Sequence, residues 1–351
     1  MNELTLGLMS ALLATNQPAA VSNLIQNQTG FAVSVATDPA EQQLEQVMIG
    51  DDATLDEINS WISTNQIPRS DTNGVAQLNR RIHDRLDVQK HGYEIFLRNH
   101  PDSAHGYLAY GSFLNDIGDE EGAKVQYENS KHYDPKNPAV WNNLANYYGE
   151  HGELTNAFAG YTEAIRLNRN EPVYYQNFAT TVYLYRKDAR EFYRINEQQV
   201  FDKALGLYRE AMQLAPQNLV FATDYAESFY GIKPFRTNDA LAAWTNALRI
   251  TKNDTEREGV QLHLARTKIS AGFFDEAQGQ LDLVTNAVFT DLKNRLTRSL
   301  ADHKNPPTNT VEEALTNRPA APKRLQTAEP KTISSTNLEA VPPPRRAQKP
   351  Q

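Results

Sequence analysis

Residues 141–168 read WNNLANYYGEHGELTNAFAGYTEAIRLN, and this stretch decides the fold. Its key positions are, in chain order, Trp141, Leu144, Ala145, Tyr148, Gly152, Ala157, Tyr161 and Ala164. Residues three and four apart share one face of a helix, and a glycine between two such runs marks a turn. The stretch therefore predicts two helices joined by a tight turn, with small residues where the helices cross.

The same pattern recurs along the chain, at first at a regular interval and later with insertions. The small residue of the first helix recurs at Gly111, Ala145, Ala179, Ala226 and Ala265. The small residue of the second helix recurs at Ala123, Ala157, Ala204, Ala240 and Ala277. Four positions after these come Tyr127, Tyr161, Tyr208, Trp244 and Leu281. The first two intervals between the first-helix residues are both 34 residues, so the chain contains an internal repeat.

This repeat resembles the tetratricopeptide repeat (TPR), a helix–turn–helix unit of 34 residues. The resemblance covers residues 104–287, about half of the chain. It implies an all-α fold, a right-handed TPR superhelix or α-solenoid of about five repeats, and we expect a bacterial member. Stacked units of this kind form an extended binding surface. The resemblance therefore implies a scaffold for protein interactions.

The register divides the chain into repeats and flanking segments. We expect repeats at residues 104–137, 138–171, 172–218, 219–257 and 258–287. The third carries extra residues near 186–199, and the fourth a longer turn at 233–236. The flanking segments are an irregular helical cap at 1–77, a helix resembling a partial repeat at 78–103, a capping helix at 288–304 and a disordered, proline-rich tail at 305–351. Within the cap, short separate helices are expected near 41–48 and 56–62.

Composition and charge limit the possible partners. The chain has 351 residues, a net charge of −8 and no cysteine. Residues 1–78 carry nine acids and one base, whereas residues 305–351 carry seven bases and four acids. We expect no strongly basic surface of the kind that holds a nucleic-acid backbone. Nucleic acid is therefore disfavoured as a partner.

The sequence contains none of three common catalytic motifs. The chain lacks a phosphate-binding GxxxxGK[ST] loop, a GxSxG nucleophile elbow and an HExxH zinc helix. His100 and His105 flank a short loop and form a metal-pair candidate, but solvent-exposed histidines at a repeat junction fit the pattern better. We predict no enzymatic activity, no cofactor and no metal site.

Both ends of the chain leave alternatives open. Residues 4–13 form an apolar run that is too short to span a bilayer. It suits a helix docked on the array, a membrane-surface or oligomer contact, or an atypical export signal without a basic start. Residues 342–346, PPPRR, suit a polyproline II ligand or a solvated tail. The cytoplasm is the expected compartment.

In the TPR family, the first helix of each repeat lines a concave groove. Carried onto this register, the resemblance implies a peptide-binding groove formed by Asn142, Asn143, Asn146, Gln176, Asn177, Thr180, Tyr183, Glu227 and Tyr230. Asn143 and Asn177 share one repeat position and resemble two rungs of the asparagine ladder in O-linked N-acetylglucosamine transferase, although asparagine is also frequent in ordinary repeats. The basic clamp of chaperone-binding TPR domains has no counterpart here. A peptide with few acids, including a basic one, is the expected ligand.

The insertion in the third repeat is a second contact candidate. Arg190, Phe192, Tyr193 and Arg194 are of the types enriched at interfaces. The aromatic pair is equally suited to packing a longer helix on its neighbour. The leading prediction for the chain is a non-enzymatic scaffold that binds a protein or peptide of unknown identity. The alternatives are a self-assembling structural protein, with an uncertain oligomeric state, and an unrecognised enzyme.

Overall fold

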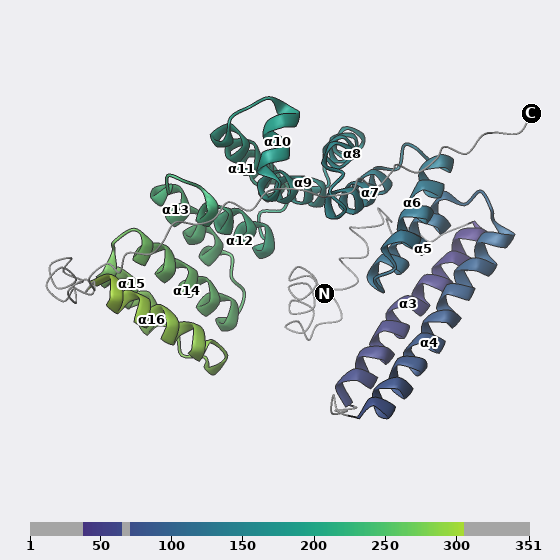
Figure 1. The fold of residues 1–351 in the computed structure, drawn as a ribbon, viewed down its shortest axis with the longest axis horizontal. Coiled ribbons are helices and arrows are strands. Elements are labelled where there is room, and N and C mark those ends of the chain that lie inside the picture. The colour runs from purple at the N-terminus through teal and green to yellow at the C-terminus, as the bar shows by residue number, and fades with distance from the viewer. Residues whose placement is uncertain (1–37, 65–70, 305–351) are drawn as a thin grey trace, which may run out of the picture. The chain divides into compact units, whose positions relative to one another are not determined.

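The structure, a computed structural model, describes residues 38–64 and 71–304 of the chain. Within these residues all regular structure is helical, as Figure 1 shows from α3 to α16. This confirms the predicted all-α fold class. The apolar run at residues 4–13 and the proline-rich tail at 305–351 lie outside the described residues.

Five helix pairs form the repeat array. They are α5 (Ala104–Asp116) with α6 (Glu120–Tyr133), α7 (Pro138–Glu150) with α8 (Leu154–Leu167), α9 (Pro172–Leu184) with α11 (Glu197–Leu214), α12 (Leu219–Ser228) with α13 (Thr237–Arg249), and α14 (Asp254–Ser270) with α15 (Phe274–Asp282). The two helices of each pair pack on each other, and each pair also contacts the next. In such an array, each pair covers the apolar face that its neighbour would otherwise expose.

Glycines end three of the first helices, among them Gly152, which the sequence predicts as a turn. Gly118, Gly152 and Gly272 have φ values of 81°, 79° and 82°. This left-handed region is open to glycine without steric cost, and it turns the chain sharply after a helix. The Asp119 amide donates back to the Leu114 carbonyl oxygen at 2.8 Å, so the last turn of α5 is closed by a hydrogen bond.

Small residues bring the paired helices close together. Ala145 on α7 and Ala157 on α8 are both fully buried. Gly160 on α8 lies against α7, where a Cβ atom would stand 2.9 Å from the Ala145 Cβ and 3.1 Å from the Trp141 carbonyl oxygen. A larger side chain at any of these three positions would push α7 and α8 apart, so the small residues set the distance between the two helices.

The insertions are ordered extensions of the array. In the third repeat, the extra residues form a short helix, α10 (Arg186–Tyr193), which packs against α8, α9 and α11 through the buried Ala189. In the fourth repeat, a 3-10 turn (Phe229–Gly231) and residues 232–236 precede α13. The Arg236 guanidinium ties this loop to Asp202 on α11 at 2.6 Å.

The N-terminal helices are longer and more regular than predicted. The two short helices expected near 41–48 and 56–62 are one helix, α3 (Pro39–Thr64), so that prediction is wrong. It pairs with α4 (Thr72–Asn99), which begins six residues before the expected start at 78. Gly50 does not break α3, because Gln89 of α4 lies against it and donates to the Val47 carbonyl oxygen at 2.7 Å. At the other end of the array, α16 (Thr290–Lys304) packs on α14 and α15 and buries Leu300.

Candidate binding face of the first helices

The first helices of the repeats carry mostly polar side chains at positions 2, 5, 6, 9, 12 and 13 of the repeat. We call this set the first-helix face. It comprises Asp116 of α5; Asn142, Asn143, Asn146 and Glu150 of α7; Gln176, Asn177, Thr180 and Tyr183 of α9; Val220, Asp224 and Glu227 of α12, with Tyr230 in the following 3-10 turn; and His263 and Arg266 of α14. All the groove residues that the sequence predicts belong to this set.

Hydrogen bonds join neighbouring repeats along this face. The Asn177 amide on α9 donates to the Asn142 side-chain oxygen on α7 at 3.1 Å. On the other side of α9, the Gln176 amide donates to a carboxylate oxygen of Asp224 on α12 at 2.7 Å. Because the bonded side chains come from three successive repeats, the polar row is continuous from α7 through α9 to α12.

The structure places the predicted asparagine rungs at different depths. Asn142 and Asn143 are buried, with 1% and 6% exposure, and the Asn142 amide donates to the Asn143 side-chain oxygen at 3.2 Å. Asn177 is half-buried. The pair therefore does not form two equally accessible rungs, since Asn143 supports the face from below. Repeat position alone does not reveal how deeply the next repeat covers a side chain.

Asn146 and Thr180 link the first helices to the second helices behind them. The Tyr161 hydroxyl on α8 donates to the Asn146 side-chain oxygen at 2.7 Å. The hydroxyls of Thr180 and Tyr208 of α11 are 2.9 Å apart. Both tyrosines are buried, whereas Asn146 and Thr180 keep part of their surface accessible. These two positions are therefore held in place and still reachable from outside.

Two carboxylates of the face lie on α12. Asp224 is half-buried, and the Glu227 side chain is 53% exposed. Desolvation by the surrounding protein raises the pKa of both carboxyls, and the charge of Asp224 raises the pKa of Glu227 further, although Arg266 opposes this. The Glu227 carboxylate is therefore accessible to a partner, although the surrounding protein excludes part of the water that would solvate it.

An aromatic and basic cluster borders these acids. His263 stacks on the buried Trp244 with ring centroids 4.3 Å apart, and its Nε2 lies 3.9 Å from the Glu227 carboxylate. Burial lowers the pKa of His263 to about 4, so the imidazole is neutral at pH 7 and does not balance Glu227. The Arg266 guanidinium lies 4.2 Å above the Tyr230 ring, a cation–π contact that orients this arginine.

Tyr183 mainly has a packing role on α9. Its ring lies 6.1 Å from that of Phe201, and the Arg186 guanidinium stands 5.3 Å from its ring centre. Burial raises the pKa of the Tyr183 hydroxyl, so it stays protonated at neutral pH. An arginine of the fold itself lies over the ring of each predicted groove tyrosine, Tyr183 and Tyr230.

The sequence prediction missed several charged members of the face. Asp116 and Glu150 end α5 and α7 at the same repeat position, and both are exposed. Desolvation raises the pKa of Asp116 to about 6 and also raises the pKa of Glu150. The repeat register gives a signal for them, because it places residue 13 of each repeat on this face. His263 and Arg266 occupy positions 6 and 9 of the last repeat, so the register gives a signal for them as well.

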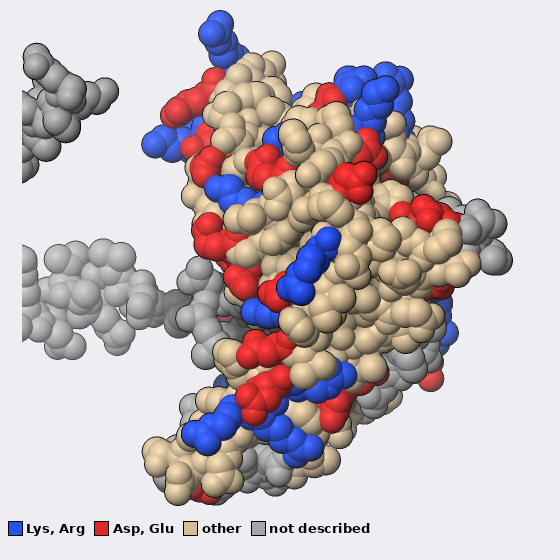
Figure 2. Space-filling model, turned by 90° about the vertical axis from the view of Figure 1, so that its right-hand side faces the viewer, with Lys and Arg blue, Asp and Glu red and all other residues tan. Residues whose placement is uncertain are grey.

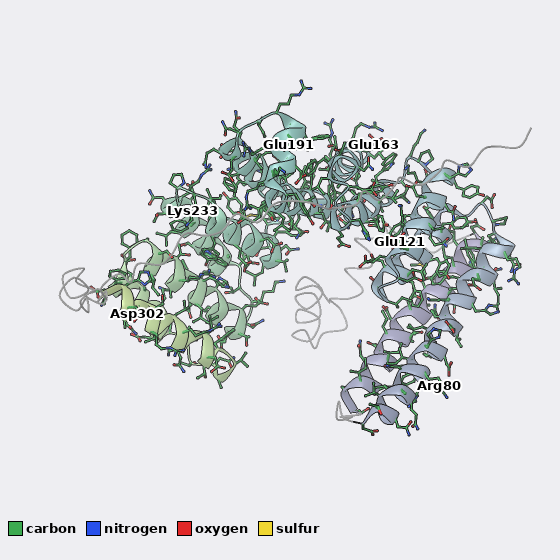
Figure 3. All side chains as sticks on the ribbon, in the orientation of Figure 1. Arg80, Glu121, Glu163, Glu191, Lys233 and Asp302 are labelled. Atoms are coloured by element: carbon green, nitrogen blue, oxygen red, sulfur yellow. The ribbon has the colours of Figure 1, made fainter. Side chains whose placement is uncertain are left out.

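The insertion helix α10 has mainly a packing role. The Phe192 ring lies 5.3 Å from Phe158 of α8, and the Tyr193 ring lies 5.6 Å from the same residue. Phe192 remains 41% exposed, and Arg190 and Arg194 are exposed as well. The four predicted contact residues therefore divide into an aromatic pair that packs on α8 and two arginines that face solvent. Figure 3 shows α10 and α8, where Glu191 and Glu163 are labelled.

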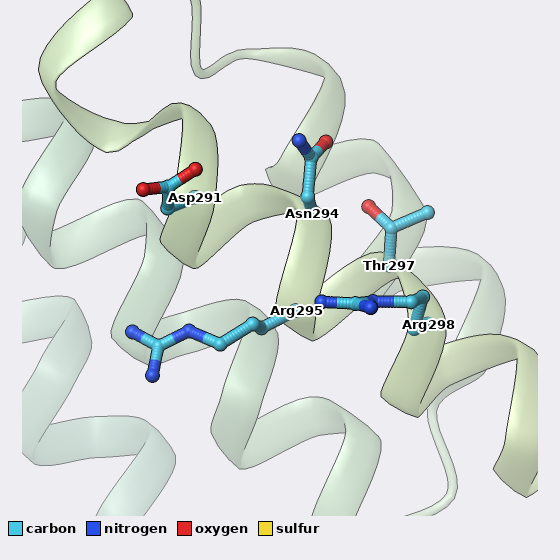
Figure 4. A pocket seen from close by; sticks show the side chains of 5 residues that line it. All are labelled: Asp291, Asn294, Arg295, Thr297 and Arg298. Atoms are coloured by element: carbon cyan, nitrogen blue, oxygen red, sulfur yellow. The ribbon is translucent and has the colours of Figure 1, made fainter.

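Three further features lie outside the first-helix face: a hollow at α16, two histidines near α3, and the mixed charge of the surface. A hollow at α16 has five described lining residues, Asp291, Asn294, Arg295, Thr297 and Arg298, all from that one helix, as Figure 4 shows. His100 and His105, the predicted metal-pair alternative, instead contact Gln43 and Glu41 of α3, each at 3.1 Å. Figure 2 shows basic and acidic side chains interspersed on the side of the molecule that it draws.

Within residues 38–64 and 71–304, no helix is both long and apolar enough to cross a bilayer.

Comparisons with known proteins find similar solved structures only. No family model matches the chain, and no curated protein matches it. YrrB, described as "a TPR protein with an unusual peptide-binding site", is 13% identical, with 59% of this chain and 97% of that chain covered and a TM-score of 0.43. Pseudomonas aeruginosa pilF is 14% identical, with 72% and 99% covered and a TM-score of 0.46. PilW, a type IV pilus biogenesis factor, is 12% identical, with 66% and 99% covered and a TM-score of 0.48.

All three TM-scores are below 0.5, so the fold is assigned from the geometry of the chain itself. Five successive helix pairs, glycine turns with positive φ and buried small residues at the crossings are all present. These features define a tetratricopeptide-like repeat fold. A helical repeat array of this kind is suited to protein–protein interaction.

Proposed function

We propose that the protein is a non-enzymatic scaffold that binds a segment of a partner protein on the first-helix face. The observation that carries this proposal is the row of polar side chains that runs through successive repeats, held by the Asn177–Asn142 and Gln176–Asp224 hydrogen bonds. A row that crosses several repeats matches the length of an extended or helical peptide better than that of a small molecule.

The chemistry of the row also suits a peptide. Amide and hydroxyl groups both donate and accept hydrogen bonds, so they can pair with a peptide backbone. Asn146, Gln176, Asn177 and Thr180 are all partly exposed. Because contacts within the fold already orient these side chains, little conformational entropy is lost when a partner binds.

Site-directed cross-linking tests the proposal. The chain has no cysteine, so one introduced cysteine can carry a benzophenone maleimide at a chosen position. Val220 on the first-helix face is 60% exposed, and Val125 on the second helix α6 is 55% exposed, which makes it a matched control. We expect the labelled Val220→Cys chain to form a defined adduct with one partner protein in extracts of its native cells. The Val125→Cys chain should form none.

The adducts distinguish the possible outcomes. Equal cross-linking from both positions, or from Val125 alone, would contradict a role for the first-helix face. A Val220 adduct between two copies of the chain would support self-assembly, the alternative function. Mass spectrometry of the adduct would give the partner and the segment that contacts α12.

A further inference from the structure

The charged groups of the first-helix face are unequally balanced. Four carboxylates belong to the face, and the only arginine or lysine in the set is Arg266. The acids are Asp116, Glu150, Asp224 and Glu227. The face therefore carries three more negative charges than positive charges at pH 7, since His263 is held neutral by burial.

These four acids lack a lysine or arginine partner, as do many other acids of the described chain, whereas some acids elsewhere are paired. On other surfaces of the described chain, Glu163 pairs with Arg166 at 2.6 Å and Glu57 pairs with Arg85 at 2.9 Å. No lysine or arginine within the described residues lies within 4.0 Å of the carboxylates of Asp116, Glu150, Asp224 or Glu227. Asp224 receives a hydrogen bond from a neutral amide, and Glu227 lies 3.9 Å from the neutral His263, while Arg266 acts on Glu227 from beyond ion-pair distance.

Carboxylates in such a position are costly for the folded protein. An ionised acid that is partly removed from water loses solvation energy unless a cation or several donors replace the water. The raised pKa values on this face have desolvation as their largest cause. A cationic group of a ligand would lower that cost, and complementary charge also directs partner choice.

Asp224 and Glu227 offer the most defined place for such a group. They are three residues apart on α12, so their side chains lie on the same side of the helix. Two carboxylates on the same side of one helix fit the charged end of a lysine or arginine side chain.

We infer that the segment bound by the first-helix face is a basic peptide, with a lysine or arginine side chain placed between Asp224 and Glu227. The inference rests on the proposed function and names the class of partner. Asp116 and Glu150 lie on the same face towards the N-terminal end of the array. Further basic residues of the same segment would meet these two carboxylates.

Selection from a peptide library tests the inference. The probe is a library of 12-residue peptides with every position randomised, bound by the immobilised full chain at about 0.05 M and 0.3 M salt. Three chains are compared: the wild type, the double variant Asp224→Asn with Glu227→Gln, and the control Glu191→Gln with Glu210→Gln. The control removes two exposed carboxylates from α10 and α11, so its change in net charge is the same.

We expect the wild type and the control to select peptides enriched in lysine and arginine. The double variant should lose that enrichment, and its affinity for the selected peptides should fall about tenfold, more at low salt than at high salt. Selection of neutral or acidic peptides by the wild type would overturn the inference and leave the proposed function standing. Equal loss in the control variant would also overturn it, because net charge would then explain the binding. If no peptide is selected by the wild type, both the inference and the proposed function fail.

Discussion

The helix crossing between α7 and α8 gives the most exact prediction, since it compares one chemical change at two sites. Replacing glycine by alanine inside a helix normally stabilises a protein by about 0.5–1 kcal/mol, because the unfolded chain loses freedom. Gly279 on α15 is exposed, and no atom lies within 4 Å of the place that its Cβ would take. We therefore expect Gly279→Ala to raise the free energy of unfolding by about that amount.

Gly160→Ala should have the opposite sign. Its Cβ would lie 2.9 Å from the Ala145 Cβ and 3.1 Å from the Trp141 carbonyl oxygen. Carbon atoms in contact are normally about 3.5–4.0 Å apart, so α7 and α8 must move apart. Overpacking of this kind costs about 1–3 kcal/mol, which leaves a net loss of up to roughly 2.5 kcal/mol after the helix gain.

Urea denaturation of the two variants and the wild type measures both effects. Circular dichroism and tryptophan fluorescence should be followed together, because a repeat array does not always unfold in a single step. We expect the unfolding midpoint to rise for Gly279→Ala and fall for Gly160→Ala. A rise of similar size in both variants would refute the close crossing of α7 and α8.

Three further predictions concern other parts of the fold. Ala145→Leu should lower the free energy of unfolding by about 1–3 kcal/mol, because Ala145 is fully buried at the same crossing; an unchanged thermal midpoint would contradict the repeat register. Burial raises the pKa of Asp51 to about 7 from an ordinary 3.8, so its cost is absent near pH 4 and complete above pH 7. As the pH rises from 4 to 7, the free energy of unfolding of the wild type should fall relative to that of Asp51→Asn by a few kcal/mol, on the order of 1.4 kcal/mol per pKa unit. If the two proteins show the same dependence of stability on pH, the burial of an ionised Asp51 is not costly. The backbone amides of Asn286 and Thr285 donate to Glu258 and lower its pKa, so this clamp is present at neutral pH and is lost as the pH falls below the ordinary value of 4.5. In Glu258→Gln, amide hydrogen exchange at Thr285 and Asn286 should be faster at pH 7, and equal rates would show that the carboxylate does not hold this loop.

The sequence predicts the repeat array well because its strongest signals are local. Gly152 fixes a turn, and Ala145 and Tyr161 recur at spacings that only paired helices use. These residues determine the fold through short-range geometry and through contacts with the adjacent helix. Both effects repeat along the chain, so each repeat supports the prediction of the next.

The features that were missed depend on contacts that the sequence does not display. The continuity of α3 depends on Gln89, which lies 39 residues after Gly50 in the chain and packs against it. The burial of Asn143 depends on how neighbouring helices cover α7. The negative charge of Glu227 is not offset by His263, because that histidine, in a different repeat, is buried and therefore neutral. Each is a matter of three-dimensional environment, so residue type and register alone could not predict it.

The central claim is that a partner segment covers the first-helix face, and the rate of cysteine alkylation tests it most directly. Single cysteines at Val220 on the face, and at Val125 and Leu214 on second helices, are treated with a maleimide in the full chain, with and without a synthetic peptide of the cross-linked partner segment. These side chains are 60%, 55% and 39% exposed, so all three should react in the free protein. With the peptide bound, we predict a severalfold slower reaction at Val220 and unchanged rates at Val125 and Leu214. Protection at Val125 or Leu214, with Val220 still reacting at its free rate, would contradict the claim.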